Sequence, residues 1–115
     1  MSNHTDLKFR TKDFALRILS LYQKLPKTTE AQILGKQLLR SGTSVGANTR
    51  SAFRGRSGKE FKSKLGIVIA EADESAFWLE LLADGRILDE ELVTELKDEA
   101  EQLVAIFVSI VKRQI

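Results

Sequence analysis

The amino-acid sequence predicts an all-α protein: an antiparallel, up-down-up-down four-helix bundle. Apolar residues recur at alternating steps of three and four, the spacing that keeps one stripe of a helix facing a partner. Breaks at Pro26, Gly55 and Gly85 divide the chain into four such stretches, and short connections between helices favour antiparallel neighbours. The sequence contains no strand-type alternation and no internal repeat. A chain of 115 residues is one domain by length, so the bundle should span residues 1–115.

The first helix is predicted at about residues 6–24. It ends before Pro26, because a proline disfavours the helical conformation in the residue that precedes it. The apolar residues of this stretch have heptad-like spacing and should face the core; they are Leu7, Phe14, Ile18, Leu21 and Leu25.

The second helix is predicted at about residues 29–54, with Thr28 or Thr29 as its N-cap. Asn48 is expected to be a buried structural residue that sets the helix register, since an unpaired buried amide costs about 1–3 kcal/mol and must find partners. A contact to a ligand is the alternative for Asn48. The expected seam mixes apolar, small and polar side chains, in the order Leu34, Leu38, Ser41, Val45, Asn48 and Ala52.

The third helix is predicted at about residues 58–83. Ser57 followed by Glu60 has the capping-box pattern that opens a helix, and Gly85 stands in the C-cap position. The residues expected to face the core are Phe61, Leu65, Val68, Ala72, Ser75, Leu79 and Leu82.

The fourth helix is predicted at about residues 89–113, with Asp89 as its N-cap. Glu90 and Glu91 suit the positive end of the helix dipole, and Lys112 and Arg113 suit its negative end. The expected core stripe is Leu92, Leu96, Leu103, Ile106 and Ile110.

Helices three and four carry more apolar residues than one core-facing stripe needs. We therefore expect a second buried face, and hence a homo-oligomer. A larger core with a few exposed apolar side chains is the alternative. The surplus residues are Ile67, Ile69, Phe77, Trp78 and Leu81 in helix three, and Val93, Val104, Phe107, Val108 and Val111 in helix four.

A net charge of +2 conceals a strong separation of charge along the chain. Between Lys36 and Lys64 eight residues are basic and Glu60 alone is acidic, whereas twelve acidic residues between Glu71 and Gln102 accompany only two basic ones. The first segment is therefore a candidate surface for a polyanion. The residues that we expect to bind nucleic acid are Arg40, Arg50, Arg54, Arg56, Lys59 and Lys62.

This basic segment favours recognition of the phosphate backbone. Guanidinium groups suit phosphate oxygens, and only Phe53 and Phe61 are interleaved as aromatic platforms for base stacking. Two other interpretations stay open: a solvated basic face, or salt bridges to the acidic fourth helix of a neighbouring subunit.

Most other site chemistry is excluded by residue type. The chain has no cysteine, and His4 is its only histidine, so the Glu-x-x-His pairs of a di-iron bundle and a histidine base for a nucleophilic site are both missing. An enzyme that uses lysine or carboxylate groups is a third, weaker alternative. Gly42 and Gly46 lack the Gly-Lys-Ser/Thr of a phosphate loop. We therefore expect no catalytic residue, no metal site and no cofactor. No signal peptide or membrane-length apolar run is visible, so the protein is expected in the cytoplasm without membrane contact.

Many positions between Leu25 and Leu88 match one known signature at fixed spacing. The matching positions are Leu25, Pro26, Glu30, Gln37, Leu38, Arg40, Ser41, Ser44, Val45, Asn48, Arg54, Arg56, Ser57, Glu60, Phe61 and Leu65. This pattern resembles the bacterial four helix bundle protein family, known for proteins encoded in 23S rRNA intervening sequences. That family also includes the accessory variability determinants of diversity-generating retroelements. After Asn48 many relatives carry an acidic residue that this more basic chain lacks.

The resemblance implies an antiparallel bundle that assembles as a homopentamer and has no enzymatic activity. Its retroelement members bind a reverse transcriptase and nucleic acid through a basic surface. Our hypothesis is therefore a non-enzymatic, oligomeric accessory protein that binds the RNA or DNA backbone. The alternative is a structural or adaptor bundle whose partner is another protein, such as a reverse transcriptase.

Overall fold

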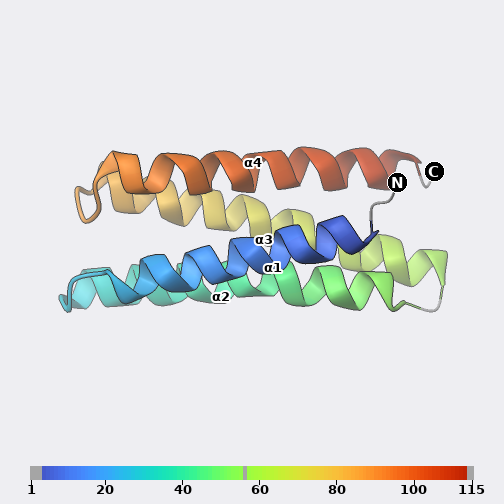
Figure 1. Cartoon of the computed structure of the whole chain (residues 1–115), viewed down its shortest axis with the longest axis horizontal. Helices are drawn as coiled ribbons and strands as arrows, with labels where there is room; N and C mark the ends of the chain where they lie inside the picture. Colours follow the sequence, from blue (N-terminus) through green and yellow to red (C-terminus); the bar gives the residue numbers. More distant parts are fainter. Residues whose placement is uncertain (1–3, 56, 114–115) are drawn as a thin grey trace.

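The computed structural model describes residues 4–55 and 57–113, which form four α-helices that run alternately up and down (Figure 1). The molecule measures 44 × 20 × 20 Å. The predicted all-α four-helix bundle is confirmed, and the predicted helix limits are within two residues of those observed. None of the described helices is long and apolar enough to cross a membrane. The helices are α1 (His4–Gln23), α2 (Thr29–Phe53), α3 (Gly58–Asp84) and α4 (Glu90–Arg113).

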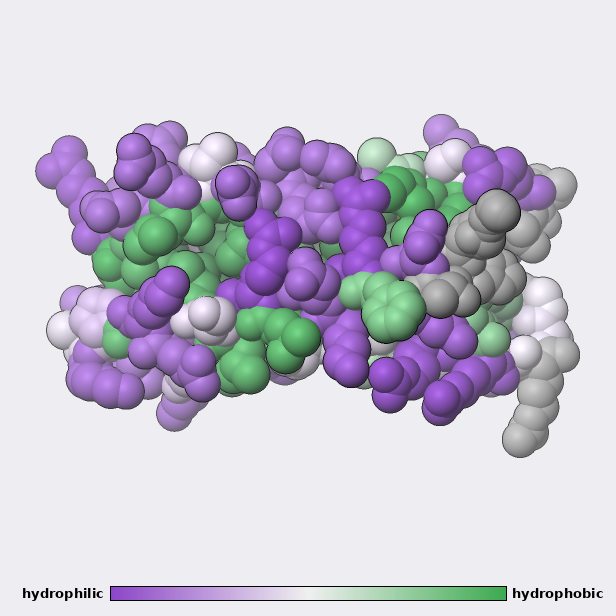
Figure 2. Space-filling model, in the orientation of Figure 1, coloured by the Kyte–Doolittle hydropathy of each residue, from purple (hydrophilic) through white to green (hydrophobic). Residues whose placement is uncertain are grey.

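The helices do not contact one another equally. α2 packs along both α1 and α3, and α3 packs along α4, whereas α1 and α4 make far fewer contacts. α1 and α3 lie at opposite corners of the bundle, since each contacts α2 and α4 but not the other. Between α1 and α4 the surface is a long seam in which apolar side chains are visible, interrupted near the middle by hydrophilic ones (Figure 2).

Threonine and serine side chains begin the two middle helices. Thr28 Oγ1 accepts a hydrogen bond from the Ala31 N–H at 3.4 Å, and Ser57 Oγ accepts one from the Glu60 N–H at 3.0 Å. Each bond satisfies one of the N–H groups that lack a partner in the first turn of a helix. The predicted caps at Thr28 and Ser57 are confirmed.

The end of α3 is a Schellman motif that leads directly into α4. The Ile87 N–H donates to the Leu82 carbonyl and the Arg86 N–H donates to the Ala83 carbonyl, both at 3.0 Å. Gly85 is the C-cap, as predicted, but its φ is −79°; the left-handed residue is Arg86, with φ of 60°. The conformation that glycine usually supplies at such an end is therefore adopted here by an arginine, at some backbone cost.

The core stripes of α1 and α3 agree closely with the sequence pattern. All five apolar residues predicted for the first helix are buried, and six of the seven predicted for the third are buried. The seventh, Phe61, is half-buried, and its ring lies 5.3 Å from that of Phe53 across the α2–α3 turn. The spacing of three and four residues was sufficient in these helices because each has one dominant apolar face.

The predicted stripe of α4 is correct at Leu96 and Leu103, which are buried, and wrong at its other three positions. Leu92 is 44% exposed, and Ile106 and Ile110 are only half-buried. Because α4 carries apolar residues on more than one face, neighbouring phases satisfy the same spacing, and packing against α3 selects between them. The buried residues of α4 are Val93, Leu96, Ala100, Leu103 and Phe107.

Three glycines of α2 allow α1 to pack very closely. A Cβ atom at Gly35 would lie 2.3 Å from Leu25 Cδ1, and one at Gly42 would lie 2.8 Å from Ile18 Cγ1. A Cβ atom at Gly46 would lie 3.2 Å from the Thr11 carbonyl oxygen. The three glycines follow at steps of seven and four, so they form one face of α2 that has no side chains where α1 crosses it.

A serine pair joins α2 to α3 at the centre of the bundle. Ser41 Oγ and Ser75 Oγ are 2.8 Å apart, and both side chains are fully buried. Ser41 Oγ lies 3.2 Å from the Leu38 carbonyl oxygen and Ser75 Oγ lies 2.9 Å from the Glu71 carbonyl oxygen, so one hydroxyl donates to the other, which in turn donates to its carbonyl. Each hydroxyl thus has a partner, so the two polar residues remain inside without the cost of an unpaired group.

We expect Gly42→Ala to destabilise the protein, because the new methyl group would overlap the buried Ile18 side chain. The free energy of unfolding should fall by about 1–3 kcal/mol, as in other overpacked cores. Urea denaturation followed by circular dichroism measures this change.

Gly66→Ala is the matched control, since a Cβ atom there meets nothing within 4 Å. It should stabilise α3 by about 0.5–1 kcal/mol through helix propensity. Equal effects of the two substitutions would contradict the close α1–α2 contact.

Candidate nucleic-acid interface

Four of the six predicted basic residues, Arg50, Arg54, Lys59 and Lys62, lie at one end of the bundle, around the turn between α2 and α3. α1 begins and α4 ends at this same end (Figure 1). Arg50, Arg54 and Lys59 are exposed, and Lys62 is half-buried. Arg56, also expected to bind nucleic acid, lies outside the described residues.

Arg50 and Arg54 border a shallow groove of about 500 Å³ at the end of α2. The two arginines are one helical turn apart and therefore project from the same face. Ala47 and Ser51 form the rest of its α2 side, and Glu60 lines it from α3. Two guanidinium groups against one carboxylate leave the groove net positive, which suits an anion.

A second groove, of about 300 Å³, runs between α1 and α2 and was not anticipated from the sequence. Lys8 and Lys12 line it from α1, and Arg50 lines it from α2 together with Ala47. Arg50 and Ala47 line both grooves, so the two grooves are adjacent. The signal was present in the sequence: the two lysines are four residues apart, and antiparallel topology puts the start of α1 beside the end of α2.

Arg40 lies apart from the other cations. Its Nη1 is 3.3 Å from Glu71 Oε1, and its Nη2 donates to Glu74 Oε2, so it joins α2 to α3. The hydrogen bond to Glu74 raises the pKa of Arg40, with the charges of both glutamates acting in the same direction against a smaller loss of solvation. Arg50 is ten residues further along α2, about 15 Å along the helix axis. Arg40 therefore lies outside the candidate interface.

Glu74 accepts a second hydrogen bond, from the Trp78 indole Nε1 at 2.9 Å. This bond is the main cause that lowers the pKa of Glu74, and Arg40 adds to it, while burial opposes both. The group of Arg40, Glu71, Glu74 and Trp78 is therefore a structural cluster on the outer face of α2 and α3.

Asn48 is half-buried rather than buried as predicted. Its Nδ2 donates to the Ser44 carbonyl at 3.0 Å and to Ser44 Oγ at 2.8 Å, both within α2. The polar residues that are fully buried in α2 are Ser41 and Thr49. The packing of α1 rotates α2 so that its glycines and Thr49 turn inward, which moves Asn48 to the edge of the seam.

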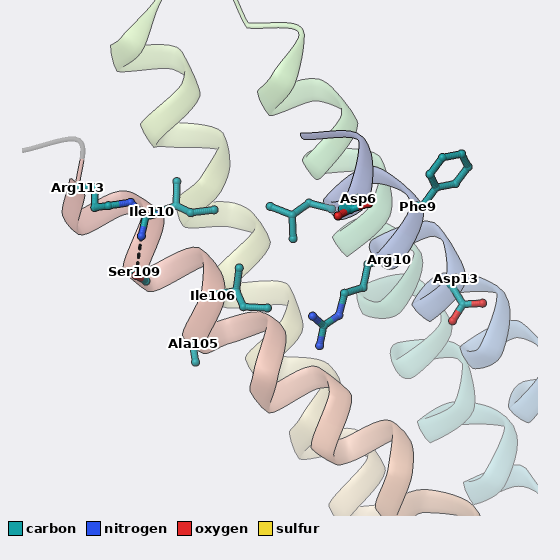
Figure 3. Close-up of a pocket in the computed structure, with 10 residues that line it drawn as sticks. Asp6, Phe9, Arg10, Asp13, Ala105, Ile106, Ser109, Ile110 and Arg113 are labelled. Carbon is teal, nitrogen blue, oxygen red and sulfur yellow. Dashed lines mark hydrogen bonds between the residues drawn. The ribbon is translucent and has the colours of Figure 1, made fainter. Parts of the chain in front are cut away.

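A cavity of about 880 Å³ lies between the start of α1 and the end of α4, at the same end of the bundle as the predicted cations but on another side of it (Figure 3). Its apolar lining includes Leu7, Ile106 and Ile110, whereas Phe9 points outward from α1. Arg10 Nε is 2.7 Å from Glu99 Oε2 across the seam, and this hydrogen bond raises the pKa of Arg10. The cations on this side of α1 are therefore used within the protein.

No group of three or more histidine, cysteine, aspartate or glutamate side chains in the described part of the chain could hold a metal ion. Any binding at the candidate interface would therefore depend on its arginine and lysine side chains.

Comparison with known proteins gives a consistent result. A family model described as 23S rRNA-intervening sequence protein matches residues 5–109. The chain is also similar to a crystallised protein of unknown function from the S23 ribosomal protein family of Bacteroides thetaiotaomicron. The two are 35% identical, with a TM-score of 0.88, and the match covers 95% of this chain and 97% of the other. No curated protein matches the chain.

We expect the Arg40–Glu74 cluster to stabilise the fold in a pH-dependent way. Because the pKa of Glu74 is lowered in the folded state, its contribution is present above the ordinary pKa of a glutamate and is lost as the pH falls through the lowered value. Glu74→Gln should lower the free energy of unfolding near neutral pH by up to about 1 kcal/mol, since the pair is partly solvated. Urea titrations at neutral and strongly acidic pH measure the difference.

Trp78→Phe removes the indole N–H donor together with part of the aromatic surface, so only the part of its effect that changes with pH reports the lost hydrogen bond, and that part should be smaller than for Glu74→Gln. A Glu74→Gln effect that is the same at both pH values would contradict the assignment.

Proposed function

The chain belongs to the 23S rRNA-intervening sequence protein family, and from that premise we propose that it is a non-enzymatic, self-associating accessory protein that binds nucleic acid. Binding would use the phosphate backbone and the cations Arg50, Arg54, Lys59 and Lys62. The observation that carries this proposal is their position at one end of the bundle, around a net-positive groove.

The chemistry of this end suits a phosphate backbone. Arginine guanidiniums donate bidentately to phosphate oxygens, and the first turn of α3 adds the positive end of a helix dipole. The rings of Phe53 and Phe61 lie against each other and are half-buried, which disfavours stacking of bases on them. We therefore propose contacts to the backbone and little discrimination among base sequences.

The acidic residues of α3 and α4 support the proposal that nucleic acid binds on one side of the bundle. A groove between α3 and α4 carries five carboxylates and Lys97 as its basic residue. Such a surface repels a polyanion, so it would orient the nucleic acid toward the α1–α2 side. Its acidic residues are Glu80, Asp84, Glu90, Asp98 and Glu101.

Exposed apolar side chains support self-association. On α3, Ile67, Phe77 and Leu81 are exposed on one face, and on α1 both Phe9 and Leu16 are more than half exposed. Because α1 and α3 occupy opposite corners, the two stripes differ, and contact between α1 of one copy and α3 of the next would be heterologous. Repetition of such a contact closes a ring when the rotation between neighbours divides a full turn, and the family resemblance implies a ring of five subunits.

The name of the family refers to 23S rRNA intervening sequences, so an RNA hairpin is the first ligand to test, beside duplex DNA. We expect binding that weakens steeply with salt and depends little on base sequence. Arg50→Glu with Arg54→Glu should weaken it by at least about tenfold, because two phosphate contacts are replaced by repulsion. Fluorescence anisotropy over a salt series measures both quantities.

Lys24→Glu with Lys27→Glu reverses two exposed charges at the opposite end of the bundle and is the matched control. Absence of wild-type binding at low salt would reject the nucleic-acid function. The adaptor interpretation would then be tested by recovery of a protein partner, such as a reverse transcriptase, after nuclease treatment.

Phe77→Ser with Leu81→Ser should dissociate the oligomer while the helices remain intact, because it removes apolar area from the α3 stripe. Light scattering at micromolar concentration measures the mass. Leu92→Ser changes an apolar residue of similar exposure on α4, outside both stripes, and should leave the mass unchanged. A monomeric wild-type protein would refute self-association.

A further inference from the structure

We infer that the nucleic-acid site extends from the α2–α3 turn onto α1, where Lys8 and Lys12 hold the backbone of a double-stranded segment in the α1–α2 groove. This inference rests on the proposed function and adds a second element, and a form of nucleic acid, to its site. The groove is lined by Lys8, Lys12 and Arg50, and Arg50 also lines the adjacent groove that Arg54 borders.

The close packing of α1 on α2 forms this groove. At Gly46 the two backbones approach so closely that a Cβ atom would lie 3.2 Å from the Thr11 carbonyl oxygen. Gly46 and Ala47 line the α2 side without long side chains, while Lys8 and Lys12 rise on the α1 side. A phosphate backbone could therefore lie over Gly46 and Ala47, with Lys8 and Lys12 on one side and Arg50 on the other.

The charges of α1 are divided between its two sides. Toward α4, Arg10 pairs with Glu99 and Arg17 lies 3.5 Å from Glu95. Toward α2, none of the described residues that line the groove is acidic. The cations on the α2 side are therefore the ones disposed to bind an anion from outside.

The side chains along this path favour a double-stranded ligand. None of the described residues that line the two grooves is aromatic, so the bases of a single strand would find no stacking partner there. A duplex presents about twice as many phosphates per unit length of axis as one strand. Contacts to the backbone alone therefore give a higher affinity for a duplex. Double-stranded RNA is recognised in this way, by its shape and backbone.

The test is fluorescence anisotropy of the full chain with a labelled RNA hairpin, over a salt series. Lys8→Glu with Lys12→Glu should weaken binding by about tenfold or more, and the slope of log K against log salt should become shallower by about two units. Lys24→Glu with Lys27→Glu carries the same change of net charge at the far end of the bundle and should have little effect. Lys8→Gln with Lys12→Gln, a milder pair, should reproduce the loss of slope if the glutamate variant is poorly folded by circular dichroism.

The outcomes separate this inference from the proposed function. If Arg50→Glu with Arg54→Glu abolishes binding while the Lys8 and Lys12 variants match the control, the extension onto α1 is wrong and the proposed function remains. Tighter binding of an unstructured single strand than of the hairpin would overturn the double-stranded assignment. Absence of binding by the wild type would remove both proposals.

Discussion

The close contact of α1 with α2 is the constraint on which the other surface features depend. Gly35, Gly42 and Gly46 supply a face of α2 without side chains. Thr11 and Ile18 of α1, and Leu25 just after α1, occupy that space. Dispersion attraction weakens sharply with small increases in the distance between atoms. The positions of these glycines therefore fix the height and rotation of α1 along α2. That rotation turns Thr49 inward, moves Asn48 to the edge of the seam and brings Lys8 and Lys12 beside Arg50.

The same arrangement divides the basic residues into two kinds. Arg40 and Arg10 meet carboxylates of other helices, where they join parts of the bundle to each other. Arg50 and Arg54 lie at the end of α2, bordering grooves in which Glu60 is the acidic residue. Charge segregation in the sequence therefore contributes both to the bundle and to the surface that we propose for nucleic acid, and the position along α2 decides which role each residue has.

The seam between α1 and α4 is the most open part of the bundle. Glycines bring α1 onto α2, whereas α1 and α4 meet through ion pairs and over a cavity of about 880 Å³. The apolar stripes on α1 and α3 lie outside this seam, at opposite corners. A bundle with most of its exposed apolar residues on two diagonal helices is suited to contact with further copies of itself.

The sequence alone determined the features that depend on near neighbours in the chain. The four helices, the caps at Thr28 and Ser57, and the core stripes of α1 and α3 follow from spacing of three and four residues and from local hydrogen bonds. Membership of the family could also be recognised from a set of positions at fixed spacing. In these cases each local preference agrees with the global fold.

Only the tertiary structure decided the features that depend on residues far apart in the chain. The phase of α4 was ambiguous because two of its faces are apolar, and packing on α3 selected Val93 and Phe107. The pairing of Arg40 with Glu74 and the meeting of Lys8 with Arg50 join residues 34 and 42 positions apart. No local spacing encodes such contacts, because they arise when the helices take their relative heights and rotations, and those are set by how side chains and glycines fit across the interface.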